Sequence, residues 1–492
     1  MTNETQFLIS QLKLINDKQI VDNIIGEIDA QRNTCKMIAS ENYASEAVQA
    51  AQAAFSLADK YSEGIPFHRY YGGCERVDEI EQACAEEACK LFGAEHAYVQ
   101  PHSGIDANLT AYQAILDHRV TEPFLKEKGF KSRGDLPQNL FKELRSLLNS
   151  QKLLAPSLNN GGHLSHGSQQ NISSQMFEVI SYEQQFDKEE DYQLLEEQAI
   201  ECKPLIILAG YSANVNKINY RKIRKIADKV NATLMVDMSH FAGLVAGKVF
   251  TGDYDPVKWA DVVTTTTHKT LRGPRGGVVL CKEEFVKSID KGCPLILGGS
   301  IQNIIAAKLV AFREAQTEEF KEYAQNIIKN RQALEDSLCA EHIEFPHSEN
   351  HMILINVHKN FGISGRQAEL ALQECGIICN RNAIPNDPLG SWYTSGIRLG
   401  VPALTSRGLK EEDFKELGRI ISFILSNIVV EKPNSIKYSF VNDASDDDFS
   451  MGLKKIFAFK IRADVKNILD RYPLYPNIDL NFVKEEVKNW EG

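Results

Sequence analysis

The sequence predicts an α/β fold with a largely parallel sheet, followed by a smaller α+β domain. Between about residues 94 and 282, short apolar and β-branched runs alternate with helical stretches, a pattern typical of a parallel sheet covered by helices. From residue 308 onward, long helical segments are mixed with short strands instead. The 492 residues also exceed the length of one ordinary domain of about 100–200 residues. These observations together favour two domains of different layout.

Composition and charge are typical of a globular protein without a strong electrostatic field. Hydrophobic residues make up 43% and charged residues 25% of the chain, and the formal net charge is −11 at pH 7. This charge would attract neither nucleic acid nor anionic lipid, so we expect neither as a partner. No apolar run reaches the roughly 18 residues of a membrane span, and residues 1–20 lack a secretory pattern. Because the ten cysteines show no paired metal-binding spacing, we expect a cytoplasmic protein with reduced thiols and no metal.

The first elements are expected to form a helical arm and then the large domain. Apolar residues between Phe7 and Ile28 recur at helical spacing, so residues 1–35 predict one or two helices that could pack on a partner subunit. The large domain is expected to span residues 36–307. Its strands are predicted at residues 96–100, 177–181, 205–209, 233–236, 262–267 and 277–281.

Two segments interrupt or extend this plan. Residues 117–156 are charged, contain leucines and carry no chemical motif, so they predict a helical insertion on the surface. Residues 308–492 predict the smaller α+β domain, which begins with a helical pattern over residues 308–338. Residues 431–450 are expected to form a solvated loop, and the chain after residue 475 is expected to be an extra tail with a last helix.

The segment DVVTTTTHKTLRGPRGG holds the strongest chemical signal. A β-branched strand ends at His268 and Lys269, and several glycines follow. Open α/β sheets bind ligands in the crevice at the carboxyl ends of their strands, so Lys269 is a candidate for covalent chemistry in such a crevice. Taken alone, a lysine in a loop is more often a solvated surface charge.

A second strand end supports this interpretation. Asp237 follows the apolar triplet at residues 234–236, and His240 lies three residues later. A buried carboxylate needs a cationic partner, and the protonated ring nitrogen of pyridoxal phosphate would be one. This cofactor requires a lysine, an acid for the ring nitrogen, a phosphate cradle and a flat group over the ring. The alternative for Asp237 is a helix cap after the strand.

Two glycine-containing segments supply candidates for the cradle and the flat group. In QPHSG, Ser103 and Gly104 precede a helix whose first amides can bind an anion, although Ser-Gly is also an ordinary N-cap. In NNGGHLSHG, His163 could lie flat over a cofactor ring. The HxxH pair of His163 and His166 has no carboxylate close by in the sequence that would complete a metal site.

Two further segments offer groups that could handle a substrate. KYSEGIPFHRYYGG has no helical or strand period, which is typical of a binding loop, and its Glu63 could transfer a proton. In TSGIRLG, Arg398 could bind a carboxylate through its fork of N–H groups, with a nearby acid as the alternative partner. A substrate that carries a carboxylate beside an imine-forming amine is an amino acid.

Together these residues resemble the serine hydroxymethyltransferase family of fold-type I pyridoxal phosphate enzymes. The motifs lie between Met37 and Gly400 in family order: MIASENY, YSEG, RYYGGCE, QPHSG, GGHLSHG, VDMSHFAGLVA, TTTTHKTLRGPRGG, NDP and TSGIRLG. The resemblance implies an aspartate aminotransferase-like fold whose large domain holds a mostly parallel seven-stranded sheet. It also implies a homodimer.

The resemblance implies a role for each matching residue. Lys269 would carry pyridoxal 5′-phosphate as a Schiff base, Asp237 would pair with the ring nitrogen, and His163 would stack on the ring, while His268 is similar to the family's specificity-setting neighbour of the lysine. The other implied cofactor contacts are His240, Ser212, Ser103, Gly104 and Arg275, with Tyr61, Gly298 and Gly299 of the neighbouring subunit. The implied substrate contacts are Arg398 and Ser40, with Glu63 and Tyr71 of the neighbouring subunit, and tetrahydrofolate would lie against Leu158, Gly162, His163, Leu164 and Asn382.

The implied activity is glycine hydroxymethyl transfer, the reversible conversion of L-serine and tetrahydrofolate to glycine and 5,10-methylenetetrahydrofolate in one-carbon metabolism and glycine biosynthesis.

Two departures from the family pattern lie near the implied phosphate site. Ile105 and Asp106 follow Gly104 where the family usually has Ser-Gln, and residues 294–297 replace a glycine-rich stretch. The first departure removes one hydroxyl group from the cradle.

Other functions remain open on the sequence. Threonine aldolases, aminotransferases and alanine racemases that share this fold also use a lysine, an acid and a carboxylate-binding arginine, so those residues do not discriminate. Glu63 and the folate-side residues favour hydroxymethyl transfer. A catalytically silent scaffold is the alternative from another class, because a fold does not prove a function.

Overall fold

The computed structural model describes residues 2–430, 432–433, 435–440, 450–488 and 490. The acidic part of the expected solvated loop, at residues 442–449, therefore lies outside the described residues. Within the described part of the chain, no helix is long and apolar enough to span a bilayer.

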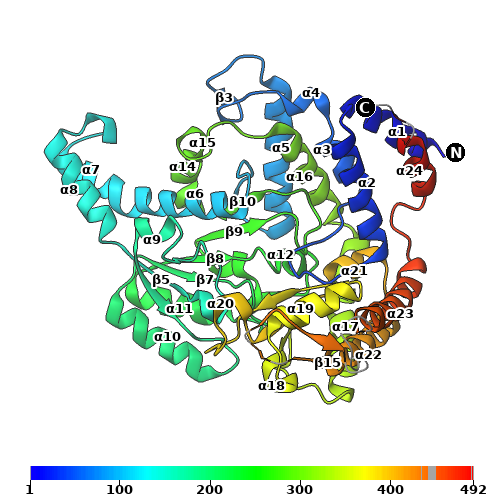
Figure 1. Cartoon of the computed structure of the whole chain (residues 1–492). Helices are drawn as coiled ribbons and strands as arrows, with labels where there is room; N and C mark the ends of the chain where they lie inside the picture. The colour runs from blue at the N-terminus through cyan, green and yellow to red at the C-terminus, as the bar shows by residue number, and fades with distance from the viewer. Residues whose placement is uncertain (1, 431, 434, 441–449, 489, 491–492) are drawn as a thin grey trace.

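A seven-stranded sheet forms the centre of the larger part of the molecule (Figure 1). Its strand order is β4-β10-β9-β8-β7-β5-β6. Strands β5 to β9 pair in parallel, whereas β10 runs antiparallel to both β9 and β4. The strands are β4 (His96–Tyr98), β5 (Lys152–Pro156), β6 (Glu178–Tyr182), β7 (Ile206–Ala209), β8 (Thr233–Asp237), β9 (Val262–Thr266) and β10 (Gly277–Cys281). The predicted mostly parallel sheet is confirmed.

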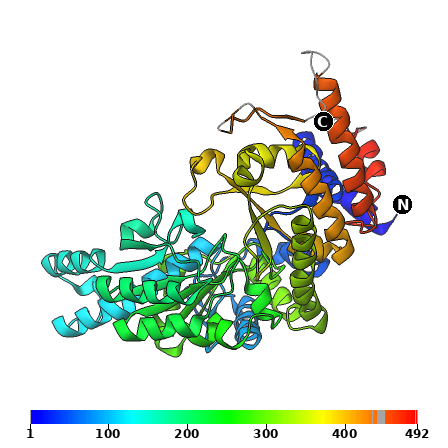
Figure 2. The same ribbon diagram turned by 90° about the horizontal axis from the view of Figure 1, so that it is seen from below.

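Helices cover this sheet, as Figures 1 and 2 show. Strands β7 to β10 are buried along their whole length, and apolar and β-branched runs of this kind suit strands that are covered on both faces. The main flanking helices are α5 (Glu75–Phe92), α6 (Gly104–Leu116), α10 (Glu189–Cys202), α11 (Tyr220–Val230), α12 (Ala242–Ala246), α13 (Pro256–Trp259) and α16 (Gln302–Glu314).

The expected helical insertion at residues 117–156 is helical only in its first part. A π-helix, Asp117–Thr121, continues α6, and α7 (Glu122–Lys128) and α8 (Gln138–Asn149) then extend from the body (Figure 1). The last five residues instead form the mostly buried strand β5. The prediction of a helical segment that reaches residue 156 is therefore wrong, because the short LLAP run after a leucine-containing helix gives no sign of a new strand.

The C-terminal part is built on a three-stranded antiparallel sheet of order β11-β14-β13. These strands are β11 (Met352–Asn356), β13 (Asn380–Asn382) and β14 (Gly396–Gly400), and the helices around them are α17 (Glu318–Ala340), α18 (Val357–Phe361), α19 (Gly365–Glu374), α21 (Pro402–Arg407), α22 (Glu411–Ser426) and α23 (Ser450–Asp470). The helical pattern expected over residues 308–338 is divided between α16 and α17, because Thr317 accepts a hydrogen bond from the Phe320 amide and starts a new helix.

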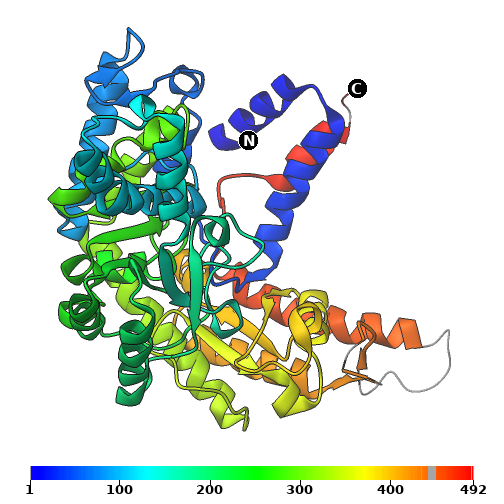
Figure 3. The same cartoon turned by 90° about the vertical axis from the view of Figure 1, so that its left-hand side faces the viewer.

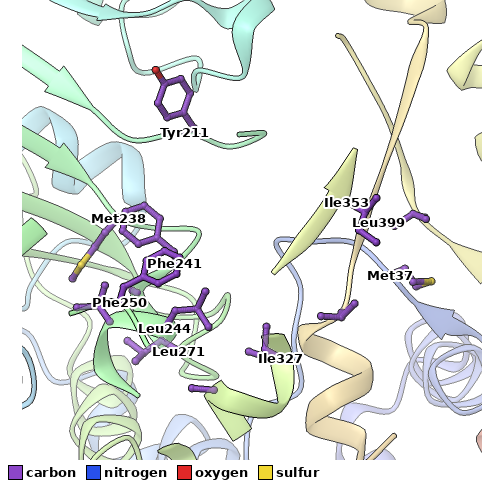
Figure 4. Close-up of a cluster of buried hydrophobic side chains, with 14 of the residues drawn as sticks. Met37, Tyr211, Met238, Phe241, Leu244, Phe250, Leu271, Ile327, Ile353 and Leu399 are labelled. Carbon is purple, nitrogen blue, oxygen red and sulfur yellow. The ribbon is translucent and has the colours of Figure 1, made fainter. Parts of the chain in front are cut away.

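One hydrophobic core joins the two parts. Leu244 and Leu271 of the larger part lie beside Ile327 of α17, and Ile353 and Leu399 of the antiparallel sheet belong to the same buried cluster (Figure 4). Interiors packed in this way deform little. The core therefore fixes side chains on β14 relative to those at the ends of β8 and β9.

The two ends of the chain form a smaller cluster beside the body (Figure 3). Helices α1 (Asn3–Ile15) and α2 (Lys18–Asn33) pack against α24 (Leu480–Lys488) through a separate apolar cluster. The expected N-terminal helices and the last helix are thus present. The packing of this arm on a partner and the domain boundaries at residues 35/36 and 307/308 stay predictions.

Short elements complete the chain. Part of the expected solvated loop is a strand, because β16 (Ser439–Phe440) pairs with β15 (Ile428–Val429). The other short strands and α-helices are β1 (Cys35–Lys36), α3 (Glu46–Gln52), α4 (Phe55–Ala58), β2 (Gly64–Ile65), β3 (His68–Arg69), α9 (Ser173–Met176), α14 (Val286–Ile289), α15 (Gly292–Leu295), β12 (Ile377–Ile378) and α20 (Gly390–Tyr393).

Candidate active site

A cavity of about 470 Å³ lies at the carboxyl ends of β7, β8 and β9. This is the edge at which open α/β sheets bind their ligands. Many of the predicted site residues line the cavity, and they come from both parts of the molecule: Ser40, Ser103, Gly104, His163, Ser212, Asp237, His240, His268, Lys269, Arg275 and Arg398.

Asp237 ends β8, and its carboxyl group is surrounded by hydrogen-bond donors. Its Oδ2 accepts from Asn108 Nδ2 at 3.0 Å and lies 3.1 Å from His166 Nε2, and its Oδ1 accepts from the Ser239 amide at 3.0 Å. Burial alone would raise the pKa of Asp237, but these hydrogen bonds outweigh burial and hold the pKa below its usual range. Since a carboxylate oxygen accepts about two hydrogen bonds, Oδ1 can still accept one from a ligand in the cavity.

Asn108 and His166 are site residues that the sequence analysis did not assign. Thr264 Oγ1 donates to Asn108 Oδ1 at 2.6 Å, which leaves the Asn108 amide nitrogen to face Asp237. Two signals in the sequence point to them. Asn108 stands one helical turn after Gly104 on α6, and His166 is the second histidine of the HxxH pair.

The amine of Lys269, in the turn that follows β9, lies in the same cavity as Asp237. Its Nζ donates to Thr266 Oγ1 at 2.8 Å. Burial lowers the pKa of Lys269 to about 8, and the charge of Asp237 opposes part of this effect. A lysine with a lowered pKa is an activated nucleophile at neutral pH.

We expect the reaction of Lys269 with an aldehyde to accelerate as the pH rises through about 8. Only the neutral amine attacks, and roughly one Lys269 in ten would be neutral at pH 7, against fewer than about one in a thousand for a solvated lysine. Stopped-flow absorbance of pyridoxal 5′-phosphate binding to the cofactor-free chain, between about pH 6 and 10, measures this rate. A rate that keeps rising to about pH 10.5 would contradict the expectation, and Lys269→Ala provides the background.

The start of α6 forms a cradle for an anion. Ser103 Oγ accepts from the Asp106 amide at 3.2 Å, as an N-cap does, and the Ser103 hydroxyl proton remains free to donate. A Cβ atom on Gly104 would lie 2.7 Å from Thr266 Cγ2, so this position requires glycine. Among the described residues, the Gly104 and Ile105 amides have no hydrogen-bond acceptor. Free amides at a helix start favour a negative group.

Arg398 stands on β14 and is 8% exposed. Its Nε donates to Asn380 Oδ1 at 3.1 Å, and its Nη1 donates to the Ser212 carbonyl. Burial lowers the pKa of Arg398 to about 10, so the guanidinium stays charged at neutral pH. No carboxylate of the described residues forms an ion pair with it. An anionic group entering the cavity would fill that role.

Two of the imidazole rings that line the cavity are neutral at pH 7. Burial lowers the pKa of His163 to about 4 and that of His268 to about 3. The lysine and arginine side chains that line the cavity are Lys269, Arg275 and Arg398. This distribution suits a ligand or ligands with separate anionic groups.

Five predicted residues do not line this cavity but form a second cluster in the same chain. Tyr61 donates through its hydroxyl to Glu63 Oε1 at 2.7 Å, and its ring meets Tyr71 edge to face at 5.1 Å between centroids. A Cβ atom on Gly299, next to Gly298, would lie 2.6 Å from the Tyr61 ring. The hydrogen bond to Glu63 raises the pKa of Tyr61 to about 12. These are residues that the resemblance assigns to the neighbouring subunit's site.

A buried ion network holds the loop that carries this second cluster. Arg69 Nε donates to Asp78 at 2.7 Å and Arg69 Nη2 donates to Glu81 at 2.7 Å, with the arginine side chain only 2% exposed. The Gly64 carbonyl accepts from Gln100 Nε2 at 2.9 Å and also from Arg69. Glu63 therefore lies next to an anchored backbone position.

The predicted folate residues lie outside the cavity, apart from His163. Leu158 and Leu164 are 48% and 45% exposed. Gly162 is required by close packing, since a Cβ atom there would lie 2.4 Å from the Pro156 carbonyl. Asn382 donates to the Ala383 carbonyl at 2.6 Å. Their role in binding a ligand stays a prediction.

Comparisons with known proteins agree with this geometry and with the expected fold-type I architecture. The family model for serine hydroxymethyltransferase matches residues 14–135 and 131–421. The chain is 48% identical to the serine hydroxymethyltransferase of Treponema pallidum, over 95% of this chain and 80% of the relative. It is 46% identical to that of Cutibacterium acnes, over 94% and 93%, and 48% identical to that of Mycolicibacterium smegmatis, over 92% and 90%. The chain belongs to the serine hydroxymethyltransferase family.

Proposed function

We propose that the chain transfers a one-carbon unit between serine and tetrahydrofolate, with pyridoxal 5′-phosphate as its cofactor. The products would be glycine and 5,10-methylenetetrahydrofolate. The convergence of Lys269, Asp237 and Arg398 on one cavity supports the cofactor and an amino-acid substrate. The single observation that carries hydroxymethyl transfer is the match of the family model to residues 14–135 and 131–421. Relatives that bear the name serine hydroxymethyltransferase over most of their length support it.

The residues present fit the cofactor. Gly104 leaves a space beside Thr266 that a Cβ atom would fill, and the first amides of α6 border that space. Ser103 with these amides would hold the phosphate, Lys269 would hold the aldehyde end, and Asp237 would hold the ring nitrogen through the free site on Oδ1. When bound, the cofactor supplies an electron-withdrawing ring that weakens bonds at the substrate α-carbon.

The chain's own side chains would orient the substrate and exclude water. Arg398 would bind the substrate carboxylate through two parallel hydrogen bonds, which places the substrate amine on the side of Lys269. His163, with its neutral ring, would cover the cofactor ring and keep water from that face. Glu63 of a neighbouring subunit would hold or accept the proton of the serine hydroxyl oxygen.

A product assay with the purified chain tests the proposed activity. With pyridoxal 5′-phosphate, L-serine and tetrahydrofolate, we expect glycine and 5,10-methylenetetrahydrofolate in equal amounts. Acetaldehyde from threonine, a keto acid from an amino donor, or L-alanine from D-alanine would be the sign of the alternative activities. If any of these exceeds the folate-dependent reaction in kcat/KM, the proposal is wrong.

A mixture of two inactive variants tests whether the site is shared between two subunits. Lys269→Ala and Glu63→Gln each remove one group from the proposed machinery. If Lys269 and Glu63 of different subunits serve one site, a mixed dimer has one site with both groups and one with neither. Random reassociation should therefore recover about a quarter of the wild-type activity.

The matched control for this mixture pairs two variants of the same cavity. Lys269→Ala with Arg398→Ala should recover nothing, because both residues line the cavity from the same chain. Mass measurement should first confirm that subunits have exchanged in the mixture of Lys269→Ala and Glu63→Gln. If the activity of this mixture then stays at the level of the separate variants, Glu63 does not act across an interface. The homodimer and the cytoplasmic location remain proposals until measured.

A further inference from the structure

Lys308 is a fully buried cation with an unusual set of partners. It stands on α16, is 1% exposed, and its Nζ donates to the carbonyl oxygens of Val99 at 2.7 Å, Pro101 at 2.9 Å and Gly277 at 2.9 Å. An ammonium group has three N–H donors, so all of them are used. Buried lysines are normally paired with an acid, but here three backbone carbonyls surround the charge.

Two of the three carbonyls belong to the segment that leads into the anion cradle, and the third belongs to a strand packed against that segment. Val99 and Pro101 lie in the connection from β4 to α6, just before Ser103, and Gly277 begins β10. The Gly277 amide donates to the Pro101 carbonyl at 2.9 Å, and a Cβ atom on Gly277 would lie 2.2 Å from the Ser103 carbonyl. The ammonium of Lys308 therefore lies directly behind the backbone that presents Ser103.

A further link connects Lys308 to the loop of Lys269. A Cβ atom on Gly276 would lie 2.4 Å from Lys308 Cε, so glycine at this position lets the lysine stem pass. The Gly276 carbonyl accepts from the Thr267 amide at 3.1 Å, two residues before Lys269. One side chain thus joins the segment with the phosphate cradle to the segment with the reactive amine.

We propose that Lys308 is a positioning residue for the phosphate cradle, an internal cation that holds residues 99–104 so that Ser103 and the first amides of α6 face the cofactor phosphate. The inference rests on the proposed cofactor. Without the ammonium, the three converging carbonyl oxygens would lose the donor that they share, while the Pro101 carbonyl would keep the Gly277 amide. A buried acceptor that loses its donor destabilises the backbone that carries it. Burial lowers the pKa of Lys308 to about 8, so the charged form still predominates at pH 7.

A phosphate-specific loss of affinity tests this role. Lys308→Met keeps most of the side-chain volume and removes the three donors. We expect the dissociation constant of pyridoxal 5′-phosphate from the full-length chain to rise roughly 10–100-fold. The dissociation constant of pyridoxal, which lacks the phosphate, should rise less than about threefold. An equal rise for both ligands, or no rise for either, would overturn the proposal.

Two further variants keep the test decisive. Lys308→Gln retains two N–H donors without the charge and should give an intermediate, still phosphate-specific, loss; if Lys308→Met does not fold, this variant decides. Lys248→Met is the matched control, because Lys248 also donates to a backbone carbonyl, that of Leu91 at 3.0 Å, but Lys248 does not line the cavity. The affinities of this variant for both ligands should not change.

The outcomes separate this inference from the proposed function. A wild-type chain that binds no pyridoxal 5′-phosphate would refute the proposed function. If the wild type binds this cofactor and the Lys308 variants bind it equally well, only this inference is refuted.

Discussion

Replacing Lys269 with alanine is expected to abolish both turnover and the absorbance of the covalently attached cofactor. The amine of Lys269 lies on the loop after β9 in the same cavity as Asp237, and removal of a covalent nucleophile costs roughly 10⁴-fold or more in kcat. A steady-state assay of 5,10-methylenetetrahydrofolate formation and an absorbance spectrum of the dialysed protein measure both effects. Thermal unfolding should stay close to that of the wild type, because a partly solvated cavity receives the shortened side chain.

The matched control for this variant is Lys282→Ala. Lys282 follows β10 and pairs with Asp261 at 3.3 Å, with 39% of its side chain exposed, so its loss should leave the spectrum and kcat nearly unchanged. A Lys269→Ala protein that keeps its yellow colour after dialysis and its turnover would contradict the assignment. If instead both proteins are colourless and inactive from the start, the chain acts as a scaffold rather than as an enzyme.

Replacing Asp237 with asparagine is expected to lower kcat by roughly 10²–10⁴-fold while the cofactor still binds. The amide has nearly the same shape but carries no charge, so a protonated ring nitrogen loses the anion that balances it in a site removed from water. The amide NH₂ would also face donors, since Asn108 and His166 both point at this side chain. Steady-state kinetics together with the cofactor content of the purified protein separate a catalytic defect from a binding defect.

Asp261→Asn is the corresponding control for a partly buried acid. Asp261 accepts from Arg224 at 2.6 Å and from the Leu234 amide at 2.8 Å, away from the cavity, so its replacement should destabilise the fold without lowering the kcat of the folded fraction. Asp237→Glu should recover part of the activity, because the charge is kept. If Asp237→Asn turns over at the wild-type rate, the carboxylate does not pair with the cofactor.

Much of the fold could be predicted because fully buried strands have a distinctive amino-acid composition. The fully buried strands β7 to β10 are short apolar or β-branched runs with turn residues beyond them, and the predictions met them to within one residue at each end. Strand β5 could not be predicted, since LLAP follows the leucines of α8 after only the four polar residues 149–152. The boundary between α16 and α17 depends on one capping hydrogen bond, from the Phe320 amide to the Thr317 side chain. The apolar residues keep their helical spacing across this boundary, so the spacing alone does not show where one helix ends.

Some of the site residues could be predicted from the sequence, and others could not. Residues in distinctive local patterns, such as Lys269 in the threonine-rich segment, could be proposed from the sequence. Lys308 could not, because it is one lysine in an ordinary helical pattern, and its acceptors lie 209, 207 and 31 residues away along the chain. The role of Asn108 could not be predicted either, since its hydrogen bond to Asp237 joins residues that are 129 positions apart in the sequence. Glu63 and Tyr61 lie outside the cavity of their own chain, so their predicted role depends on a second subunit.

Reductive trapping is the direct test of whether Lys269 carries the cofactor. Borohydride reduction of the full-length chain with pyridoxal 5′-phosphate, followed by digestion and mass spectrometry of the peptides, identifies the lysine that bears the cofactor. We expect one modified residue, Lys269. Pyridoxal, which lacks the phosphate, should prevent this modification at low concentration in variants with a damaged cradle but not in the wild type. Modification at another lysine, or none at all in a folded protein, would contradict the assignment of Lys269.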